Sequence, residues 1–486
     1  MAFRRNKKEG VHHCNGSIVE MEKNFGERKK NMNETLQRFE KMLESSEQEF
    51  VDLETFEKVT GHYMEMGDWE KALLACDRGL ADFPYSLDLI LSKVQVLANK
   101  GDHEQAHELL DRAALFHPGD VEITFMQVAL ANMVGDFEEA VELLESLAYR
   151  VDDQDEIYFQ LGQTYQNAGK LEEAVGYFKK TLAHNLDHED ALLELTHCLE
   201  MLGQLESHLD YYTDLVDQAP FSWLAWFNLG VAYRRLDRNI DSVQALEYAI
   251  LIKEDFASGY FQLGNAYMSL EKFEDAKAQY LIALKLEDDQ PEIHCCLGTC
   301  YERLEAYDQA IKCYQKTVKL DPMWDDGWYG LGICFNELER WYEAVGFFRR
   351  AIQITALNPD YWLALAETEF KVGNVISAFE AFEKAAEIEP SNPEIWLKWS
   401  LVLFEQGNYA RAIDLLQAAI EDLPEEADLY YHMAVYHIHS GDYREALIFL
   451  ETALTLDYDG HIQLFDFFQE LDKQKALYKI IEQYRQ

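Results

Sequence analysis

The sequence predicts an all-α protein, an α-solenoid of about twelve helix pairs with capping helices at both ends. Three observations lead to this fold class: a period of 34 residues, two helix-type apolar patterns in every period, and glycine or proline at fixed positions. A fixed period indicates a structural unit that stacks on copies of itself. We therefore expect one elongated domain, although 486 residues would ordinarily suggest about three globular domains.

The period is clearest over residues 257–324, where two blocks of 34 residues repeat the same residue types. Extending this register in both directions, without insertion or deletion, gives twelve blocks from Leu53 to Gly460. We number the positions of each block from 1 to 34. All nine prolines fall at the seams, at position 32 or position 1, where a residue that breaks a helix interior is tolerated.

Each block is expected to form two helices. In the first helix, apolar residues recur at positions 4, 7, 8 and 11, which share one helix face. One block has Trp226, Leu229, Gly230 and Tyr233 at these positions. Positions 17, 20, 24 and 27 repeat the pattern in the second helix, and small residues at 8 and 20 let the two backbones approach. Position 15 is glycine in eight blocks and acidic in four, and glycine there ends the first helix with a left-handed turn.

These residues resemble the tetratricopeptide repeat family. That family has a large apolar residue at position 4, Leu at 7, Gly at 8, Tyr at 11, Ala at 20, an aromatic at 24, Ala at 27 and Pro at 32. Residues 291–324 and 325–358 meet this pattern almost in full. The repeats are also similar to those of long repeat-only proteins of the Bacteroidota. The resemblance implies a right-handed superhelix, first helices that line a concave groove, and binding of other proteins.

The segments outside the blocks have different compositions. Residues 1–32 are basic without apolar periodicity, so we expect a disordered tail, and Met21 or Met32 is an alternative translation start. Residues 33–52 are expected to form a helix that caps the first repeat, since terminal repeats lack a neighbour. Residues 461–486 are expected to form closing helices; the alternative is a dimer contact through the same apolar stripe.

The charge is strongly acidic, with 43 Lys and Arg against 89 Asp and Glu and a net charge of −46. Such a surface repels the phosphates of nucleic acid and an anionic membrane face. No stretch is long and apolar enough to span a bilayer, and the basic start lacks the apolar core of a secretory signal. We therefore expect a cytoplasmic protein with neither a nucleic-acid nor a membrane partner.

The motifs give no indication of an enzyme, because no nucleophile elbow, phosphate loop or dinucleotide fingerprint is present. Cys295, Cys296 and Cys300 invite a metal or redox interpretation, but no CxxC pair accompanies them, and free packed thiols are favoured. His103 and His107 have the spacing of a two-ligand metal face without a third ligand nearby. We expect no catalytic residue, no metal and no cofactor.

In the tetratricopeptide repeat family, positions 2, 5, 9, 12 and 13 of the first helix face the concave groove. The resemblance therefore implies that these positions contact a partner. Position 5 is almost wholly apolar here, and position 2 is acidic in ten of twelve repeats. Together they favour a partner segment with apolar and basic side chains. Both features have a structural alternative: the helix dipole favours an acid in the first turn, and position 5 side chains can pack between repeats.

The candidate partner-binding residues are aromatics at position 5 and polar residues at positions 9, 12 and 13, where the fold itself requires no amide. They are Phe125, Phe159, Gln163, Gln166, Asn167, Phe227, Arg234, Phe261, Asn265, Tyr329, Asn336 and Tyr431. We expect a non-enzymatic scaffold, most simply a monomer, that binds a peptide or protein in its concave groove. The alternative is a self-associating structural solenoid, a homodimer through its terminal helices.

The repeat pattern weakens between residues 189 and 242. Thr196 and His208 replace the small residues of the helix crossing in the fifth repeat, and Ser242 does so in the sixth. Larger or polar residues at a close helix crossing should loosen it. This segment is therefore where we expect a bend.

Overall fold

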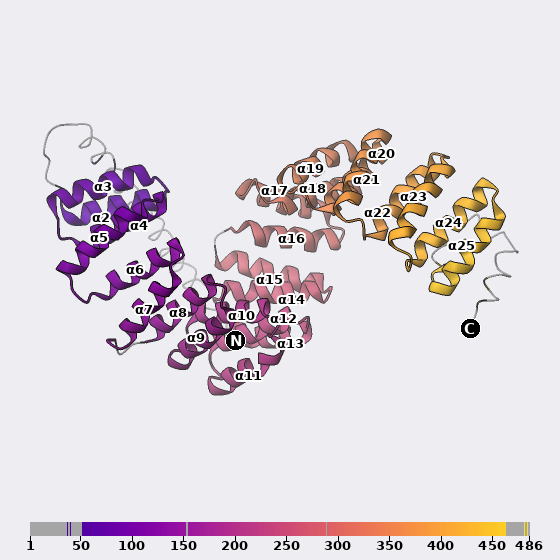
Figure 1. Cartoon of the computed structure of the whole chain (residues 1–486). Helices are drawn as coiled ribbons and strands as arrows, with labels where there is room; N and C mark the ends of the chain where they lie inside the picture. The colour runs from indigo at the N-terminus through magenta and orange to yellow at the C-terminus, as the bar shows by residue number, and fades with distance from the viewer. Residues whose placement is uncertain are drawn as a thin grey trace, which may run out of the picture. The chain divides into compact units, whose positions relative to one another are not determined.

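The computed structural model describes residues 51–151, 154–287 and 289–462, together with Leu36, Phe39, Ile481 and Tyr484. All regular structure in this part of the chain is helical: 24 α-helices and one short 3₁₀ helix, η1 (Figure 1). The prediction of an all-α fold is confirmed. In the same residues no helix is long and apolar enough to cross a membrane.

The helices alternate between first and second members of a pair. The first helices are α2 (Leu53–Glu65), α4 (Leu87–Lys100), α6 (Val121–Val134), α8 (Asp155–Asn167), α10 (Glu189–Met201), α12 (Trp223–Arg235), α14 (Ala257–Ser269), α16 (Pro291–Arg303), α18 (Asp325–Glu337), α20 (Pro359–Val372), α22 (Pro393–Glu405) and α24 (Ala427–Ser440). The second helices are α3 (Trp69–Asp82), α5 (His103–Phe116), α7 (Phe137–Ala148), α9 (Leu171–His184), α11 (Leu209–Gln218), α13 (Asn239–Ile252), α15 (Phe273–Leu286), α17 (Tyr307–Leu320), α19 (Trp341–Ile354), α21 (Val375–Ile388), α23 (Tyr409–Asp422) and α25 (Tyr443–Leu456).

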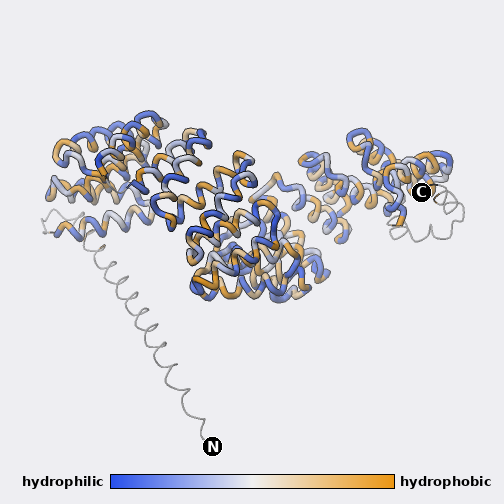
Figure 2. Tube along the Cα trace, turned by 90° about the horizontal axis from the view of Figure 1, so that it is seen from below, coloured by the Kyte–Doolittle hydropathy of each residue, from blue (hydrophilic) through white to orange (hydrophobic). Residues whose placement is uncertain are grey.

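Every first helix begins at position 1 of its block, and every second helix except α11 begins at position 17. Each helix packs chiefly on the helices before and after it in the chain, as in a solenoid of helix pairs. First helices of adjacent repeats also contact each other, for example α2 with α4 and α18 with α20. Hydrophobic and hydrophilic residues alternate along the helices (Figure 2), as expected of elements with one buried face.

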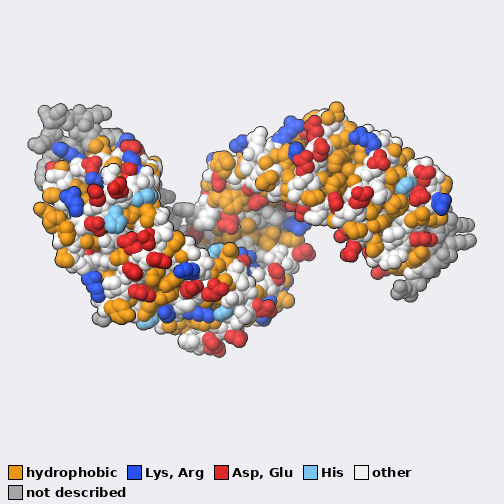
Figure 3. All heavy atoms as spheres, in the orientation of Figure 1, with side chains coloured by type: hydrophobic (Ala, Val, Ile, Leu, Met, Phe, Trp, Pro, Cys, Tyr) orange, Lys and Arg blue, Asp and Glu red, His pale blue; other side chains and the backbone are white. Residues whose placement is uncertain are grey.

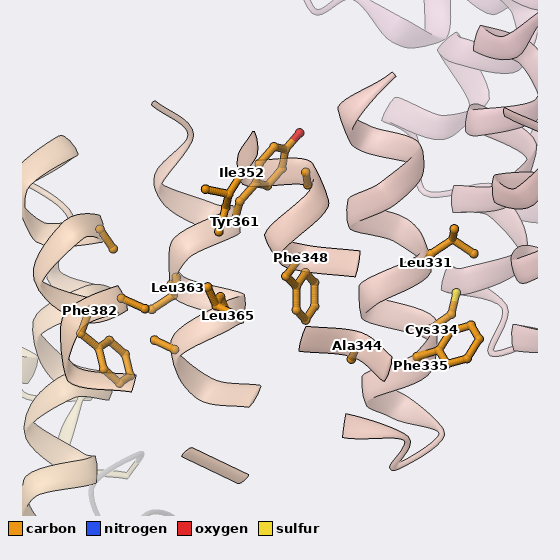
Figure 4. Close-up of a cluster of buried hydrophobic side chains, with 14 of the residues drawn as sticks. Leu331, Cys334, Phe335, Ala344, Phe348, Ile352, Tyr361, Leu363, Leu365 and Phe382 are labelled. Carbon is orange, nitrogen blue, oxygen red and sulfur yellow. The ribbon is translucent and has the colours of Figure 1, made fainter. Parts of the chain in front are cut away.

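The chain divides into two compact units, Met1–Asn228 and Leu229–Gln486, and the boundary lies inside α12. Each unit has its own layered core of buried side chains. In the second unit one cluster extends over several repeats, and Figure 4 shows part of it: Leu331 from α18, Phe348 from α19, Leu365 from α20 and Phe382 from α21. The layers consist of side chains from successive helices, so each repeat completes the core of its neighbours.

Position 15 has a left-handed backbone in all twelve repeats. The eight glycines have φ between 64° and 94°, and Asp237, Glu271, Glu305 and Glu339 have φ of 56° to 58°. A Cβ added at any of these eight glycines would meet no atom within 4 Å. Backbone conformation and not space therefore selects glycine here, and four repeats adopt the same turn with a carboxylate residue.

Position 8 shows the opposite situation, because there space is limiting. A Cβ at Gly298 would lie 2.7 Å from the Tyr314 ring, which fills position 24 of the same repeat. The close approach of the two backbones, predicted from small residues at this position, is thus a steric requirement.

The seams between repeats have a hydrogen bond that recurs. The indole of Trp328 donates to the carbonyl of Pro322 at 3.0 Å, and that of Trp362 donates to the carbonyl of Ala356 at 2.8 Å. Trp226 and Trp396 bond in the same way to the prolines six residues before them. An indole at position 4 therefore ties the first helix to the carbonyl at position 32 of the preceding block.

The fifth repeat departs from the register. η1 (Glu206–His208) replaces the start of its second helix, and the His208 Nδ1 lies 3.0 Å from the carbonyl oxygen of Gln204. Thr196 is buried and its hydroxyl lies 2.7 Å from the Tyr212 hydroxyl. The sixth repeat keeps its register, because buried Ser242 donates to the Gly230 carbonyl at 2.8 Å. The unit boundary falls within residues 189–242, where we expected a weakening; the bend itself stays a prediction.

Most of the predicted terminal segments lie outside the described residues: the tail 1–32, the capping helix 33–52 and the closing helices 461–486. Phe39 and Ile481 are among the few described residues of these segments. Phe39 is buried with its ring centroid 5.9 Å from that of Phe56, and Ile481 is buried in the core of the last repeats.

Candidate partner-binding surface

The position 5 aromatics lie on the first helices and differ in exposure. Phe159, Phe227 and Tyr431 are 6%, 5% and 1% exposed, which leaves almost no surface for a partner. Phe125, Phe261 and Tyr329 are half-buried and keep a solvent-facing edge on α6, α14 and α18.

Three of these rings lie against an aromatic ring at position 24 of the same repeat. Ring centroids lie 5.9 Å apart for Phe159 and Phe178, and 5.8 Å apart for Phe261 and Tyr280. Tyr329 lies 5.7 Å from Phe348 in the same way. In these three repeats the position 5 ring packs between the two helices of its own pair, whereas the structural alternative given for position 5 was packing between repeats.

Three of the candidate polar residues already bond within the fold. Gln166 donates to Glu194 at 2.7 Å, Asn265 accepts from the Tyr280 hydroxyl at 2.7 Å, and Asn336 accepts from Lys371 at 3.3 Å. Gln163 is half-buried and Asn167 is exposed on α8. The internal bonds hold Gln166, Asn265 and Asn336 in fixed orientations. Gln163 and Asn167 can instead turn towards a partner, because a surface amide exchanges hydrogen bonds with water readily.

The candidates do not form one site. Phe159, Gln163, Gln166 and Asn167 share α8 in the first unit, where Phe125 stands on α6 and Phe227 on α12. In the second unit, the charge of half-buried Arg234 interacts electrostatically with Tyr280, whose hydroxyl donates a hydrogen bond to Asn265. Burial raises the pKa of Tyr280 above its ordinary value, and the Arg234 charge opposes that rise. Tyr329 and Asn336 lie on α18, and Tyr431 lies on α24.

Sequence reasoning missed two inward carboxylates. Glu369 is completely buried on α20, paired with Arg349 at 2.5 Å and bonded by Asn374 at 2.7 Å. Glu302 on α16 accepts from the Tyr314 hydroxyl at 2.7 Å, and burial raises its pKa. The sequence did offer one signal, since Glu369 occupies position 11, where the pattern has tyrosine. A carboxylate at a core position must find a partner, so an internal ion pair could have been expected there.

Within the described residues, the thiols and imidazoles do not assemble a metal site. In the described part of the chain, no three His, Cys, Asp or Glu side chains come together as metal ligands would. Its seven cysteines are free, and burial raises the pKa of Cys300 and Cys334 to about 12. Those thiols stay protonated at neutral pH, when they are poor nucleophiles and poor ligands. Cys14 lies outside the described residues.

Comparison with protein-family models identifies the repeats. Models described as "Tetratricopeptide repeat" match residues 63–124, 159–222, 291–323, 359–402 and 403–464, and one described as "TPR repeat" matches residues 264–305. Together these matches cover more than half of the chain. The chain belongs to the tetratricopeptide repeat family. Tetratricopeptide repeats are typical of non-enzymatic interaction scaffolds, so the family supports a protein-interaction role in general terms.

Several solved structures resemble the chain at low identity, and a search of curated proteins found no match. "YrrB: a TPR protein with an unusual peptide-binding site" is 20% identical, with a TM-score of 0.33 over 38% of this chain and 95% of YrrB. The Cut9 and Hcn1 hetero-tetramer of the APC/C gives 13% identity and a TM-score of 0.38, over 90% of this chain and 97% of that chain. MamA gives 19% identity and a TM-score of 0.32, over 34% and 97%.

Proposed function

We propose that this tetratricopeptide repeat protein is a non-enzymatic scaffold that holds a peptide segment of a protein partner against its first helices. The observation that carries the proposal is a row of exposed carboxylates at position 2 of four successive first helices, α16 to α22. They are Glu292, Asp326, Asp360 and Glu394. Because adjacent first helices contact each other here, the row is continuous along one side of the second unit.

The row favours a partner with lysine or arginine side chains. Glu292 and Asp360 form no ion pair with another described residue, so a basic partner would gain their charge without displacing an internal one. The half-buried Tyr329 ring and the Asn336 amide lie on α18, the helix that also bears Asp326. An extended or helical segment with alternating apolar and basic side chains matches this combination.

A monomer is consistent with the end of the repeat array. Ile481 is 4% exposed and belongs to the core cluster that includes α24 and α25. The burial of this side chain within its own chain supports a cap, because a buried side chain is unavailable to a second copy. Light scattering that shows a stable dimer would favour the self-associating alternative.

The test is cross-linked affinity capture of partners from native cells with the parent chain and with Glu292→Lys/Asp360→Lys. A matched control reverses Asp275 and Asp308, exposed acids in the first turns of second helices α15 and α17. Both variants change the net charge equally and place a lysine at a helix N-terminus, so their folding costs are similar. We expect the first variant to lose the basic partner and the control to retain it. Equal capture by both variants would show that the first helices are not the binding surface.

A further inference from the structure

Position 7 of the repeat is a core position that three of the twelve repeats fill differently from the rest. Nine of the twelve repeats have a buried apolar residue there, which packs under the second helices of its own and the preceding repeat. These residues are Val59, Leu161, Leu195, Leu229, Leu263, Leu297, Leu331, Leu365 and Met433. The other three are half-buried: Lys93, Gln127 and Trp399.

The surface between two second helices is hollowed where Trp399 takes this position. The groove over α22, between α21 and α23, has a volume of ≈ 580 Å³. Trp399 and Leu403 form its floor, Phe379 stands on the α21 side, and Leu415 and Ala418 stand on the α23 side. Such a volume suits several large apolar side chains.

The physical cause of the groove is the size of the indole. Trp399 stacks on the Phe382 ring with centroids 6.2 Å apart, so it cannot sink beneath α21 as a leucine does. The junction of α21 with α22 is the loosest between consecutive helices α13 to α25. The hydrophobic core also divides here, with Val402 in one cluster and Leu403 in the next.

A second hollow lies over Gln127, which also replaces a buried apolar residue at position 7, but its lining is more polar. It lies over α6 between α5 and α7, with adjoining volumes of ≈ 410 Å³ and ≈ 220 Å³ that share Gln127. Much of that lining is polar, including His103, His107 and Glu139. Both hollows therefore lie over a first helix that lacks a buried apolar residue at position 7, and the apolar floor distinguishes the Trp399 groove as a place for hydrophobic side chains.

The rim of the Trp399 groove is charged and predominantly acidic. Glu380 and Glu383 stand on α21, and Arg411 and Asp414 stand on α23. None of these four side chains forms an ion pair with another described residue. Ile376, at the end of the groove, is 77% exposed. Figure 3 shows hydrophobic side chains gathered over α21 and α22 with acidic side chains beside them.

We propose that the groove between α21 and α23 binds an amphipathic helix of a protein partner. Large apolar side chains of one helix face enter over Trp399 and Leu403, and lysine or arginine side chains beside them lie against Glu380 and Glu383. The negative rim supplies the charge complementarity, and the groove is too small for more than one face of a helix. This surface belongs to the second helices, so it is separate from the first-helix surface proposed above.

The test uses fluorescent helical peptides of 14 residues, the length of α21 and α23. One has a leucine stripe flanked by lysines, a second has glutamates in place of the lysines, and a third has the lysine composition with the stripe scrambled. Binding to the full chain is measured by fluorescence anisotropy at physiological ionic strength. We expect the Leu/Lys helix to bind and the other two to bind about tenfold or more weakly.

Two variants assign the binding to the groove. Trp399→Leu restores the common residue at position 7 and should close the groove without lowering the melting temperature. Ala418→Trp fills the groove from an exposed position. Thr452→Trp is the matched control, at the same repeat position on α25, where Met433 is buried below. Both groove variants should weaken binding about tenfold, and the control should not.

Three outcomes would overturn the proposal. The Leu/Lys helix could fail to bind the parent chain, or it could bind both groove variants as tightly as the parent, which would place it elsewhere on the acidic surface. Light scattering could instead show a parent dimer that Ala418→Trp dissociates, and the occupant would then be a second copy of the chain.

Discussion

Replacing Glu305 by glycine should stabilise the protein. Glu305 occupies position 15 with φ of 58°, in the left-handed region where a side chain strains the backbone. The corresponding glycines have empty space where a Cβ would lie, so the effect of the substitution comes from backbone conformation and hardly from packing. The backbone of a residue other than glycine costs about 1 to 2 kcal/mol in this conformation.

The net gain is smaller than that cost, because glycine also gives the unfolded chain more freedom, worth about 0.4 to 1 kcal/mol. We therefore expect Glu305→Gly to raise the free energy of unfolding by about 0.5 to 1 kcal/mol. Glu271 and Glu339 have φ within 1° of Glu305 and lie one repeat away on either side. The three substitutions should add to about 2 kcal/mol, since separate sites without shared partners contribute independently.

The assay is urea unfolding followed by circular dichroism, combined with native-state hydrogen exchange of α16 and α17. Exchange is needed because a long repeat array does not unfold in one step. The reciprocal control is Gly407→Glu, at φ of 71°, which should destabilise its repeat by a similar amount. If Glu305→Gly lowered the stability, its carboxylate would have to make an interaction stronger than the backbone strain, and the argument from φ would be refuted.

Three further predictions concern buried or irregular positions. Burial lowers the pKa of His432 from 6.5 to about 4, so stability is unaffected above pH 6.5 and is lost as pH falls towards 4, where only the unfolded chain takes up the proton. The loss of unfolding free energy by pH 5.5 is about 1 to 2 kcal/mol. Urea titrations should show this loss in the parent but not in His432→Leu. Leu331→Ala, at a side chain 1% exposed, should cost about 2 to 5 kcal/mol, whereas Leu357→Ala, at a side chain 80% exposed, should leave the urea midpoint almost unchanged. His208→Ala should raise the melting temperature and the helical circular dichroism signal by letting the second helix of the fifth repeat start at its regular position; a lower melting temperature would mean that the imidazole bond to Gln204 is needed.

The repeat register was accessible from sequence because it depends on backbone requirements that few residues satisfy. The positions of the prolines set the seams, and the glycines at position 15 set eight of the turns. The left-handed backbone of the four acidic residues at this position, such as Glu305, was found only in the structure. The packing of small residues under large rings, as at Gly298 and Tyr314, followed from the same pattern. These are local constraints, and local constraints are legible in a periodic sequence.

The surface was harder to anticipate. Phe159 and Phe227 could be assigned to the inward face of a helix, but their burial depends on the side chains packed around them, such as the Phe178 ring across the helix pair from Phe159, which periodicity does not report. Glu369 is stabilised by Arg349 from the preceding repeat, a pairing between positions that the register treats as unrelated. The consequence of Trp399 depends on how far the neighbouring helices can move apart, which is a property of packing and not of position.

The boundary inside α12 has a practical consequence for dissecting the protein. Leu224 and Phe227 are buried before the boundary, and Leu229 and Ala232 are buried after it. Cutting the chain at the repeat seam would deprive the first unit of its closing residues, and cutting at the boundary would halve a helix of 13 residues. Fragments intended to fold alone should therefore overlap, each ending or beginning with all of α12. When two such fragments are mixed, their two copies of α12 would compete for the same packing position.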